Sequence, residues 1–436
     1  MKKPFLVAMM VLAVVTAARA EDLIQKGETL SLDRSIEIAL KKHPNIFASA
    51  GAVDVNQARK RQAESQYYPQ IDASAGYTRF QPSTISTGQT VVGVRRLEES
   101  NSFEQYNTNL TARQTIFDFG RRSSNVNIQK LNIEASRADL ANTEEQVILN
   151  VKQAYYNLLR AKRTRAVAED TVKQFEQHLN QAKAFYEVGT KPKFDVTKAE
   201  VDLSNARLGM ITAENGVRLA IVSLNNAMGV PDAPDYEIED NLSFQKYEIT
   251  ADAAMELAYA NRPELKSILA KKKAADEAVS LARSDYFPFL TGDAGWTWAG
   301  KAGDFATGDG WNAGLTVSIP IFSGFLTKGQ VSEAKANLMI LTANEEGLRQ
   351  NVLLEVQQSL LNLREAAERI VTAELTAQQA LENFDIANGR YAAGVGNPIE
   401  VTDAEVTLAN AKTSNIQALY DYKIARANLE KAMGVR

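Results

Sequence analysis

The chain has 436 residues and no cysteine, and it carries 49 Lys and Arg against 53 Asp and Glu, for a formal charge of −4 at pH 7. The lack of cysteine excludes disulfides, thiol catalysis and cysteine-based metal sites, and we expect no lipid anchor on an N-terminal cysteine. The mildly acidic balance gives no electrostatic reason to expect a nucleic-acid partner.

Residues 1–20 have the pattern of a cleaved secretory signal peptide. Lys2 and Lys3 precede an apolar run over residues 5–15, and the small residues 18 and 20 offer a cleavage site before Glu21. Loss of the three cations in this segment takes the formal charge from −4 to −7. No later run of about 18 apolar residues occurs, so we expect no transmembrane helix.

The rest of the chain contains two copies of one unit. At an offset of 219 residues, DRSIEIALKKHPNI from Asp33 aligns with DAAMELAYANRPEL from Asp252. At an offset of 205 residues, IFDFGRRSSNV from Ile116 aligns with IFSGFLTKGQV from Ile321, and NAMGV aligns with KAMGV. The offset therefore changes by 14 residues between Thr78 and Ile116. A repeat of this length indicates duplication of a whole substructure.

This repeat predicts the domain organisation. The first structural repeat covers residues 21–230, a linker covers 231–250, and the second structural repeat covers 251–436. Each repeat has the order helix, β-hairpin, long helix, turn and helix. We expect the hairpins at about residues 70–118 and 289–322.

Seven-residue periods indicate coiled-coil helices. No proline lies between Pro82 and Pro192 or between Pro320 and Pro398. Apolar residues recur every seven positions through the first of these windows: Val126, Ile133, Leu140, Val147, Ala154, Ala161, Ala168, Phe175 and Ala182. Alanine rows follow each turn, and a strict heptad of this length predicts left-handed supercoiling. Residues 121–188 would form a helix about 100 Å long. The alternative is ordinary amphipathic packing.

Four segments alternate between apolar and small polar residues with period two, after Pro69, after Pro288 and before each long helical window. Alternation over about ten residues is typical of transmembrane barrel strands, and the alternative is a soluble sheet with one buried face. We expect the aromatic residues near the loop ends of these strands to lie at the membrane interface: Tyr77, Trp296, Trp298 and Trp311.

The number of strands bears on the oligomeric state. Four strands cannot close a barrel, and lipid does not tolerate an open sheet edge. A chain that spans the membrane in this way must therefore oligomerise. Two copies give eight strands with a filled interior, whereas three copies give twelve strands and room for a lumen. A pore therefore favours a trimer.

The sequence offers little to an enzyme. His43 and His178 are the only histidines, and no HExxH, GxxxxGK[ST] or serine nucleophile elbow occurs. The stretch GDFATGDG at residues 303–310 has the composition of a calcium loop but lacks the EF-hand spacing. We expect no catalytic residue, no metal site and no cofactor.

The chain resembles the outer membrane efflux protein family, the TolC-like export ducts of Gram-negative bacteria. The resemblance rests on LSLDRSIEIALKKHPNI (30–46), QTIFDFGRR (114–122), YEVGTKPKFDVTKAE (186–200) and the second copy of each, such as YAAGVGNPIEVTDAE (391–405). It covers nearly the whole mature chain. The order, spacing and duplication of these motifs carry it, rather than any single one.

The resemblance implies a mainly α fold with a small β part. A long coiled-coil α-helical barrel would be continuous with an outer-membrane β-barrel of four strands per chain, twelve in a homotrimer. The chain would lie in the outer membrane, in contact with its lipid, with the helical part in the periplasm.

The resemblance also implies passive conduction. A periplasmic adaptor (membrane fusion protein) and an inner-membrane RND or ABC transporter would deliver small toxic compounds, or proteins in type I secretion, for export to the cell exterior. The alternative function is a periplasmic coiled-coil adaptor or scaffold without a pore.

In that family the two helix-turn-helix joints form the periplasmic tip, where the tunnel narrows. The resemblance assigns the gate and selectivity acids to Glu400 and Asp403 and the gate latch to Asp195 and Tyr391. Alternatively, Glu400 and Asp195 only cap the start of a helix, as acids in its first turn. Adaptor docking is assigned to the turn residues: Val188, Gly189, Thr190, Ala393, Gly394 and Val395.

The chain departs from the family at one latch position. The latch arginine of the family falls on Gly396. We expect either a weaker latch or a substitute cation from the other turn, Lys191 or Lys193.

Overall fold

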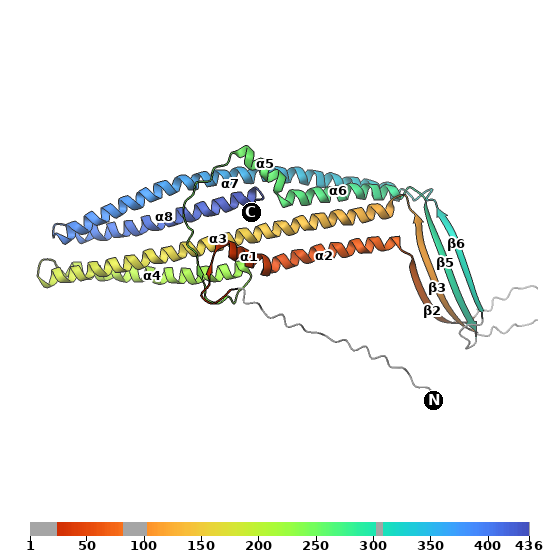
Figure 1. The fold of residues 1–436 in the computed structure, drawn as a ribbon, viewed down its shortest axis with the longest axis horizontal. Helices are drawn as coiled ribbons and strands as arrows, with labels where there is room; N and C mark the ends of the chain where they lie inside the picture. Colours follow the sequence, from red (N-terminus) through yellow and green to blue (C-terminus); the bar gives the residue numbers. More distant parts are fainter. Residues whose placement is uncertain (1–23, 82–102, 302–307, 436) are drawn as a thin grey trace, which may run out of the picture. The chain divides into compact units, whose positions relative to one another are not determined.

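The computed structural model describes residues 24–81, 103–301 and 308–435. The predicted signal peptide at residues 1–20 and the loop residues 82–102 and 302–307 lie outside the described residues. Helices dominate, and a small sheet accompanies them (Figure 1). None of the described helices combines the length and the hydropathy needed to cross a membrane.

Apart from one 3₁₀ turn in the first set, the described elements follow the same order twice. The first set is β1 (Thr29–Leu30), α1 (Leu32–Lys42), α2 (Pro44–Glu64), the 3₁₀ turn η1 (Ser65–Tyr67), β2 (Gln70–Phe80), β3 (Phe103–Phe117), α3 (Arg121–Glu187) and α4 (Lys193–Met228). The second set is β4 (Glu237–Ile238), α5 (Ala251–Asn261), α6 (Pro263–Ser284), β5 (Phe289–Lys301), β6 (Gly308–Ser318), α7 (Leu326–Ala392) and α8 (Pro398–Ala432). The mainly helical fold with four hairpin strands and a two-fold repeat is confirmed.

The chain folds into two compact units. Unit 1 comprises Met1–His43, Val147–Lys246 and Glu365–Ile424, and unit 2 comprises Pro44–Gln146, Tyr247–Arg364 and Ala425–Arg436. Both units contain segments of both copies. The compact units therefore do not coincide with the repeats predicted at 21–230 and 251–436, and the boundaries of those repeats stay a prediction.

The short helices of the two copies begin at equivalent N-cap residues and prolines. Ser31 and Thr250, 219 residues apart, are N-caps whose side chains accept the backbone N–H groups of Arg34 and Ala253. α2 and α6 both begin at a proline, a position where the N–H would have no partner inside the helix.

The repeated NAMGV and KAMGV sequences end α4 and α8 at close backbone contacts. Gly229 and Gly434 have φ angles of 73° and 66°. A Cβ on Gly229 would lie 2.9 Å from the Cα of His43, and a Cβ on Gly434 would lie 2.9 Å from the backbone N of Arg262. Only glycine satisfies both the left-handed conformation and the close approach.

The sheet of unit 2 is antiparallel, in the order β2-β3-β5-β6 (Figure 1). Paired residues share a face, as do alternate residues along a strand. The register therefore gathers the apolar positions on one face: Ile71, Ala73, Ala75, Tyr77, Tyr106, Leu110, Ala112, Leu290, Ala294, Trp296, Trp298, Trp311, Ala313, Leu315 and Val317. The opposite face is polar and includes Asp72, Ser74, Asn107, Asn109, Thr111, Thr297, Asn312 and Thr316.

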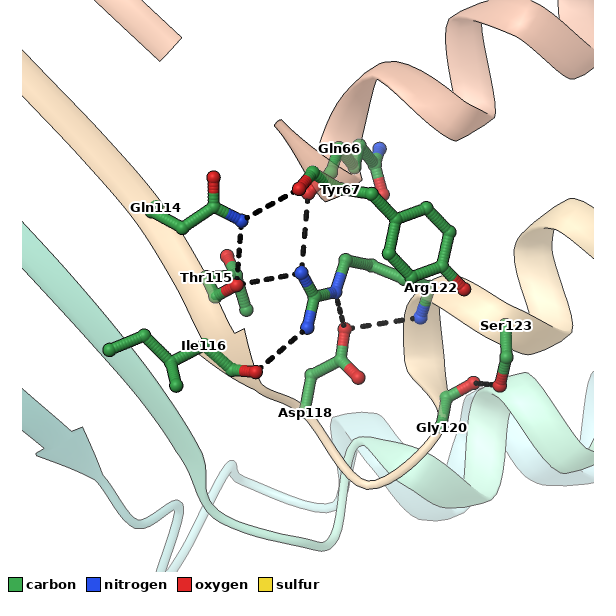
Figure 2. A network of polar contacts seen from close by, with 9 residues as sticks. All are labelled: Gln66, Tyr67, Gln114, Thr115, Ile116, Asp118, Gly120, Arg122 and Ser123. Atoms are coloured by element: carbon green, nitrogen blue, oxygen red, sulfur yellow. Dashed lines mark hydrogen bonds and ion pairs between the residues drawn. The ribbon is translucent and has the colours of Figure 1, made fainter. Parts of the chain in front are cut away.

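A polar network joins β3 to α3 (Figure 2). The ladder between β3 and β5 shifts register between Thr115 and Phe117. Arg122, in the first turn of α3, donates hydrogen bonds to the carbonyl oxygens of Thr115 (2.6 Å) and Ile116 (3.2 Å). Its Nε also donates to Asp118 Oδ2 at 2.8 Å. One side chain thus pairs backbone carbonyls at the irregular end of the strand.

The second copy forms this junction with neutral side chains. Ser323 and Thr327 occupy the positions of Asp118 and Arg122 at the offset of 205, and their hydroxyl oxygens lie 3.1 Å apart. The side chains of Asp118 and Arg122 are only 10% and 12% exposed. The first junction therefore depends on a largely buried ion pair and the second on a hydroxyl pair.

Equivalent residues form the cores of the two helical hairpins in unit 1. The α3–α4 core consists of Phe175, Leu179, Ala182, Ala199 and Leu203. The α7–α8 core consists of Ala380, Phe384, Ala387, Tyr391, Val401, Ala404, Leu408 and Ala411. Alanines of both rows lie at the helix contacts, where small side chains let helix axes approach closely.

The middle of the predicted α3 heptad row is not fully buried. Ala154, Ala161 and Ala168 are only partly covered, and the last two line a cavity of about 470 Å³ between α3, α4 and α8. Arg160 lies at its wall and donates a hydrogen bond of 2.7 Å to Gln417. Apolar packing gives way here to a long polar side chain that bridges two helices.

Candidate functional site

The turns after α3 and α7 have the same backbone geometry. Gly189 and Gly394 have φ angles of 74° and 79°. The N–H of Thr190 donates to Phe185 O and the N–H of Gly189 donates to Tyr186 O, and the same two bonds recur 205 residues later. This is the Schellman motif, in which a residue in the left-handed region ends the helix. Glycine adopts that conformation without strain.

The residues predicted to dock an adaptor form the surface of these two turns. Val188 and Val395 are apolar and yet 71% and 72% exposed. Their neighbours Thr190 and Ala393 are exposed as well. Exposed apolar side chains at a helical tip fit a protein partner. The docking role of Val188, Gly189, Thr190, Ala393, Gly394 and Val395 stays a prediction.

The two predicted latch residues lie in the interior of unit 1. Asp195 is 5% exposed and Tyr391 is fully buried. The Tyr391 ring contacts the rings of Phe185 and His178, with centroid distances of 5.6 and 5.0 Å. Within the described chain, Tyr391 Oη has no hydrogen-bond partner. Burial raises the pKa of Tyr391 and the charge of Asp195 raises it further. The acid therefore acts on the tyrosine through its charge rather than through a hydrogen bond.

Of the two candidate cations, Lys191 is the one that contacts the latch. Its Nζ donates a 3.3 Å hydrogen bond to the carbonyl oxygen of Gly396 and lies 5.5 Å from the ring centroid of Tyr391, within cation–π range. Lys193 is exposed, and no comparable contact of its side chain occurs in the described part of the chain. A Cβ on Gly396 would lie 2.6 Å from the backbone N of Tyr391, so this turn has no room for the family's arginine.

The two predicted gate acids lie on the exposed side of α8. Glu400 and Asp403 are both exposed, and their three-residue spacing places them on one helix face. Glu400 Oε2 lies 3.7 Å from Arg390 Nε. Glu400 is also in the first turn of α8, as the helix-start interpretation requires. The gate role of Glu400 and Asp403 stays a prediction.

The two latch residues belong to a larger set of buried polar residues, whose other members were not indicated by the sequence patterns. We call it the interhelix polar cluster, and its members are His178, Asp195, Asp202, Tyr391 and Thr402. Lys198 Nζ binds both carboxylate oxygens of Asp202 at 2.7 and 2.8 Å, and Thr402 Oγ1 donates to Asp202 at 3.0 Å. Asp202 thereby links α4 to α8. The available signal was the seven-residue spacing of Asp195 and Asp202, which repeats an acid at one heptad position.

Glu405 is a further buried acid on α8. It lies three residues after Thr402 and therefore on the same face of the helix. Burial raises the pKa of Glu405 to about 7, against the opposing charge of Lys412.

Among residues 24–81, 103–301 and 308–435, no group of three or more His, Cys, Asp or Glu side chains is placed to hold a metal ion.

The predicted interface aromatics lie on the apolar face of the sheet in unit 2. Tyr77 packs against its strand partner Tyr106 at 5.2 Å between ring centroids, and Trp296 stacks on Trp298 at 5.8 Å. Trp311 pairs with Trp296 in the ladder and is the most exposed of the four at 74%. Amphipathic rings of this kind fit a lipid headgroup layer, and this role stays a prediction.

A second group of exposed aromatics lies at the ends of the strands that adjoin the helices. Its members are Tyr67, Tyr68, Phe117, Phe119, Tyr286, Phe287, Phe322 and Phe325. Phe119 stacks on Phe287 with ring centroids 5.2 Å apart. The sequence patterns did not indicate this group because its residues fall between strand and helix, where neither period applies.

Comparison with known families decides the class of protein. A family model described as outer membrane efflux protein matches residues 35–230 and 254–435, which is most of the chain. The chain belongs to the outer membrane efflux protein family. This confirms the resemblance read from the sequence and the predicted location in the outer membrane.

Individual relatives are distant but span most of the chain. The chain is 23% identical over 451 residues to outer membrane protein TolC of Escherichia coli, which covers 100% of this chain and 87% of TolC. It is 24% identical over 411 residues to the toluene efflux pump outer membrane protein TtgC of Pseudomonas putida, covering 93% of this chain and 83% of TtgC.

Solved structures of the same fold include outer membrane channels. The chain is similar to the CmeC channel of Campylobacter jejuni, with a TM-score of 0.79 at 19% identity over 92% of this chain and 85% of that one. It is also similar to the open state of the MtrE channel of Neisseria gonorrhoeae, with a TM-score of 0.78 at 20% identity over 93% and 89%. At these identities the similarity shows the fold, which agrees with the predicted one.

Proposed function

We propose that the chain is one subunit of a homotrimeric outer-membrane channel that conducts substrates passively to the cell exterior. The sheet of unit 2 carries this proposal. Its outer strands β2 and β6 each have one edge without a strand neighbour in the described chain, and one face of the sheet is apolar. Pairing β6 of one copy with β2 of the next satisfies both edges. Three such sheets close into twelve strands around a lumen lined by the polar face.

Exposed apolar residues on the long helices support the same assembly. Those on α4 are Val201, Leu208, Ile211, Leu219 and Val222, and those on α7 include Leu354, Leu361, Val371 and Leu375. Single exposed apolar side chains are ordinary, but rows of them along helices of this length fit packing against a neighbouring subunit. The periplasmic helical barrel is the expected product of that packing.

The proposed partners follow from the turns and from the family. The exposed valines of the two turns would contact a periplasmic adaptor, and an inner-membrane RND or ABC transporter would supply the energy. Relatives of similar identity are named for different exports, toluene for TtgC and pyoverdine for OpmQ of Pseudomonas aeruginosa. We therefore propose no cargo narrower than small toxic compounds or proteins in type I secretion.

The state of the tip would control conduction. Glu400 and Asp403 from three subunits would surround the axis and favour cations. Lys191, Tyr391 and Asp195 would hold the closed arrangement. A similar solved structure is described as the open state of the MtrE channel, which supports a channel that takes more than one state.

Planar-bilayer recordings of the purified protein test the gate. We expect Glu400→Ala combined with Asp403→Ala to weaken block by divalent cations and to lower cation selectivity under a salt gradient. The matched control is Glu374→Ala with Glu382→Ala, which removes two exposed acids of α7 and leaves those of α8 in place. Equal block and selectivity in both double variants would rule out the gate assignment.

Fractionation and cross-linking test the assembly. We expect the protein in the outer-membrane fraction, with a cross-linked species of three chains. A soluble or inner-membrane protein that cross-links only to dimers would instead support the adaptor or scaffold alternative.

A further inference from the structure

The interhelix polar cluster occupies positions where a coiled-coil contact would ordinarily be apolar. His178 of α3, Asp195 and Asp202 of α4, Tyr391 of α7 and Thr402 of α8 are each at most 7% exposed. All five lie within unit 1, and together they draw on four helices. Any separation of the α3–α4 hairpin from the α7–α8 hairpin in this region exposes the cluster to water.

The two halves of the cluster differ in how well they are hydrogen bonded. Asp202 has three hydrogen bonds, two from Lys198 and one from Thr402. His178 Nδ1 and Tyr391 Oη are buried and have no hydrogen-bond partner in the described chain. The rings of His178 and Tyr391 contact each other at 5.0 Å with planes inclined by 52°. A buried polar atom without a partner costs about 1–3 kcal/mol, so the closed contact contains a built-in weakness.

Because one member of the contact is a histidine, the stability of the His178–Tyr391 contact depends on pH. Histidine is the side chain whose ordinary pKa lies closest to physiological pH, and His178 and His43 are the only histidines in the chain. The imidazole in the cluster is held against an aromatic ring instead of water. A proton added to it places a cation between helices without the hydration that such a cation needs.

We propose that His178 makes the latch between the two helical hairpins sensitive to pH, so that its protonation in an acidic periplasm loosens the closed tip. This inference deepens the proposed function and rests on it, because a latch has a role only in a tip that opens. The event that is sensed is the protonation of His178, and the structural change that follows is a loosening of the contact between α3 and α7.

The groups facing His178 determine the direction of the response. Burial lowers the pKa of His178, the charges of Asp202 and Asp195 oppose this, and the charge of Lys198 lowers the pKa further. On α7, Tyr391 contacts the His178 ring, and the Nζ of Lys191 lies over the ring of Tyr391. On α8, Thr402 belongs to the cluster through its hydrogen bond to Asp202.

The lowered pKa makes the closed contact most stable when His178 is neutral. That stability is present above the ordinary pKa of histidine and is lost as the pH falls through the lowered value. A separated contact returns the imidazole to water and to its ordinary pKa. Each unit of difference between the two pKa values changes the closed-to-open ratio about tenfold in acid.

Glu405 near the tip also responds to pH, so the experiment must assign the response to His178. Glu405 has a raised pKa and therefore acts in the opposite direction, weakening the structure as pH rises. A structural readout at the turns, together with substitution of each histidine, separates these contributions.

The experiment uses two nitroxide labels, one in the first helical turn of α4 and one on the turn after α7. The chain has no cysteine, so Phe194→Cys and Val395→Cys, both exposed, accept labels specifically. Labelled chains are diluted into unlabelled ones, so that most assemblies hold a single labelled copy. We expect the interlabel distance in the full-length protein to lengthen as pH falls from about 7.5 to 4.5, with a midpoint below the ordinary histidine pKa. His178→Gln should abolish this transition, and His43→Gln should leave it unchanged.

A second variant tests the mechanism if His178→Gln alters packing. Asp195→Asn removes a charge that favours protonated His178 and should move the midpoint to lower pH. A transition that persists in His178→Gln, or the lack of any transition in the unsubstituted protein, overturns the proposal. Conductance is recorded in parallel. A distance change without any conductance at any pH supports the latch and contradicts the proposed channel.

Discussion

Lys191 donates a hydrogen bond to the carbonyl oxygen of Gly396, which is its own counterpart 205 residues later in the repeat. The two turns share one backbone geometry, but one supplies a cation and the other supplies only backbone. The same lysine lies over the ring of Tyr391. Lys191 of the first turn therefore contacts the predicted latch tyrosine of the second, and its role as the substitute for the family's arginine stays a prediction.

Removal of Lys191 should weaken the closed tip. Lys191→Met loses one hydrogen bond and one cation–π contact, together worth about 1–2 kcal/mol. We expect the open fraction to rise by a factor of about 5–30, measured as open probability in planar bilayers. Lys193→Met is the matched control and should leave the open probability unchanged. An equal effect of the two variants would refute the assignment of Lys191.

Restoring the family's arginine at Gly396 should not restore the family's latch. Any side chain there meets the backbone of Arg390 and Tyr391, with Tyr391 N only 2.6 Å from the added Cβ. We expect Gly396→Arg to destabilise unit 1 by about 1–3 kcal/mol, seen as a lower melting temperature of the purified protein. Gly209→Ala, whose added Cβ meets no atom within 4 Å, should be neutral or stabilising. A melting temperature for Gly396→Arg at or above that of Gly209→Ala would contradict this geometry.

The first strand-to-helix junction should be more sensitive to substitution than the second. Arg122→Met leaves Asp118 largely buried without its ion-pair partner and removes the hydrogen bonds that Arg122 donates to the carbonyl oxygens of Thr115 and Ile116, for a loss of about 3 kcal/mol. Thr327→Val removes one hydroxyl contact and should cost about 1 kcal/mol. Both losses are measurable by thermal denaturation of the purified protein.

Copying the hydroxyl pair of the second junction into the first tests whether the unpaired Asp118 causes the loss of stability. Asp118→Ser combined with Arg122→Thr copies the hydroxyl pair of the second copy and leaves no buried charge. We expect this double variant to be more stable than Arg122→Met alone. The opposite order would show that the cost comes from the lost arginine packing on Tyr67 rather than from the unpaired acid.

Glu405 should make unit 1 less stable as the pH rises. Its pKa is raised by burial to about 7, so its contribution is fully present below the ordinary glutamate pKa and is lost as the pH rises through about 7. Glu405→Gln should remove this loss and gain on the order of 3 kcal/mol at pH 8. Melting temperatures between about pH 5 and 8 measure the effect. Glu200→Gln, the exposed counterpart in the first copy, should show no such pH-dependent gain.

The elements were predictable because their signals are local. Heptad periods and proline positions predicted a long helix over residues 121–188, and α3 ends at Glu187. Alternation predicted four strands and their apolar face, because a period of two specifies which side chains share a side. The heptad row does not indicate that its middle is only partly buried, where Arg160 bridges to Gln417 beside a cavity.

The polar interior of unit 1 was not predictable from local signals. His178 and Tyr391 are separated by more than 200 residues and become neighbours only through the packing of α3 with α7. The choice between Lys191 and Lys193 likewise depended on which side of the first turn faces Gly396. The sequence located the turns, whereas the direction of each side chain required the packed helices.

The register of the sheet also shows where this chain can change length. Gly76 pairs with Asn107, and their counterparts Gly295 and Asn312 pair in the same way. The 14-residue difference between the copies is therefore confined to the segment between Gly76 and Asn107. One residue added inside a strand would turn its later apolar side chains to the opposite face. Epitope tags and reporter peptides should accordingly be tolerated beyond the hairpin ends and not within the ladders.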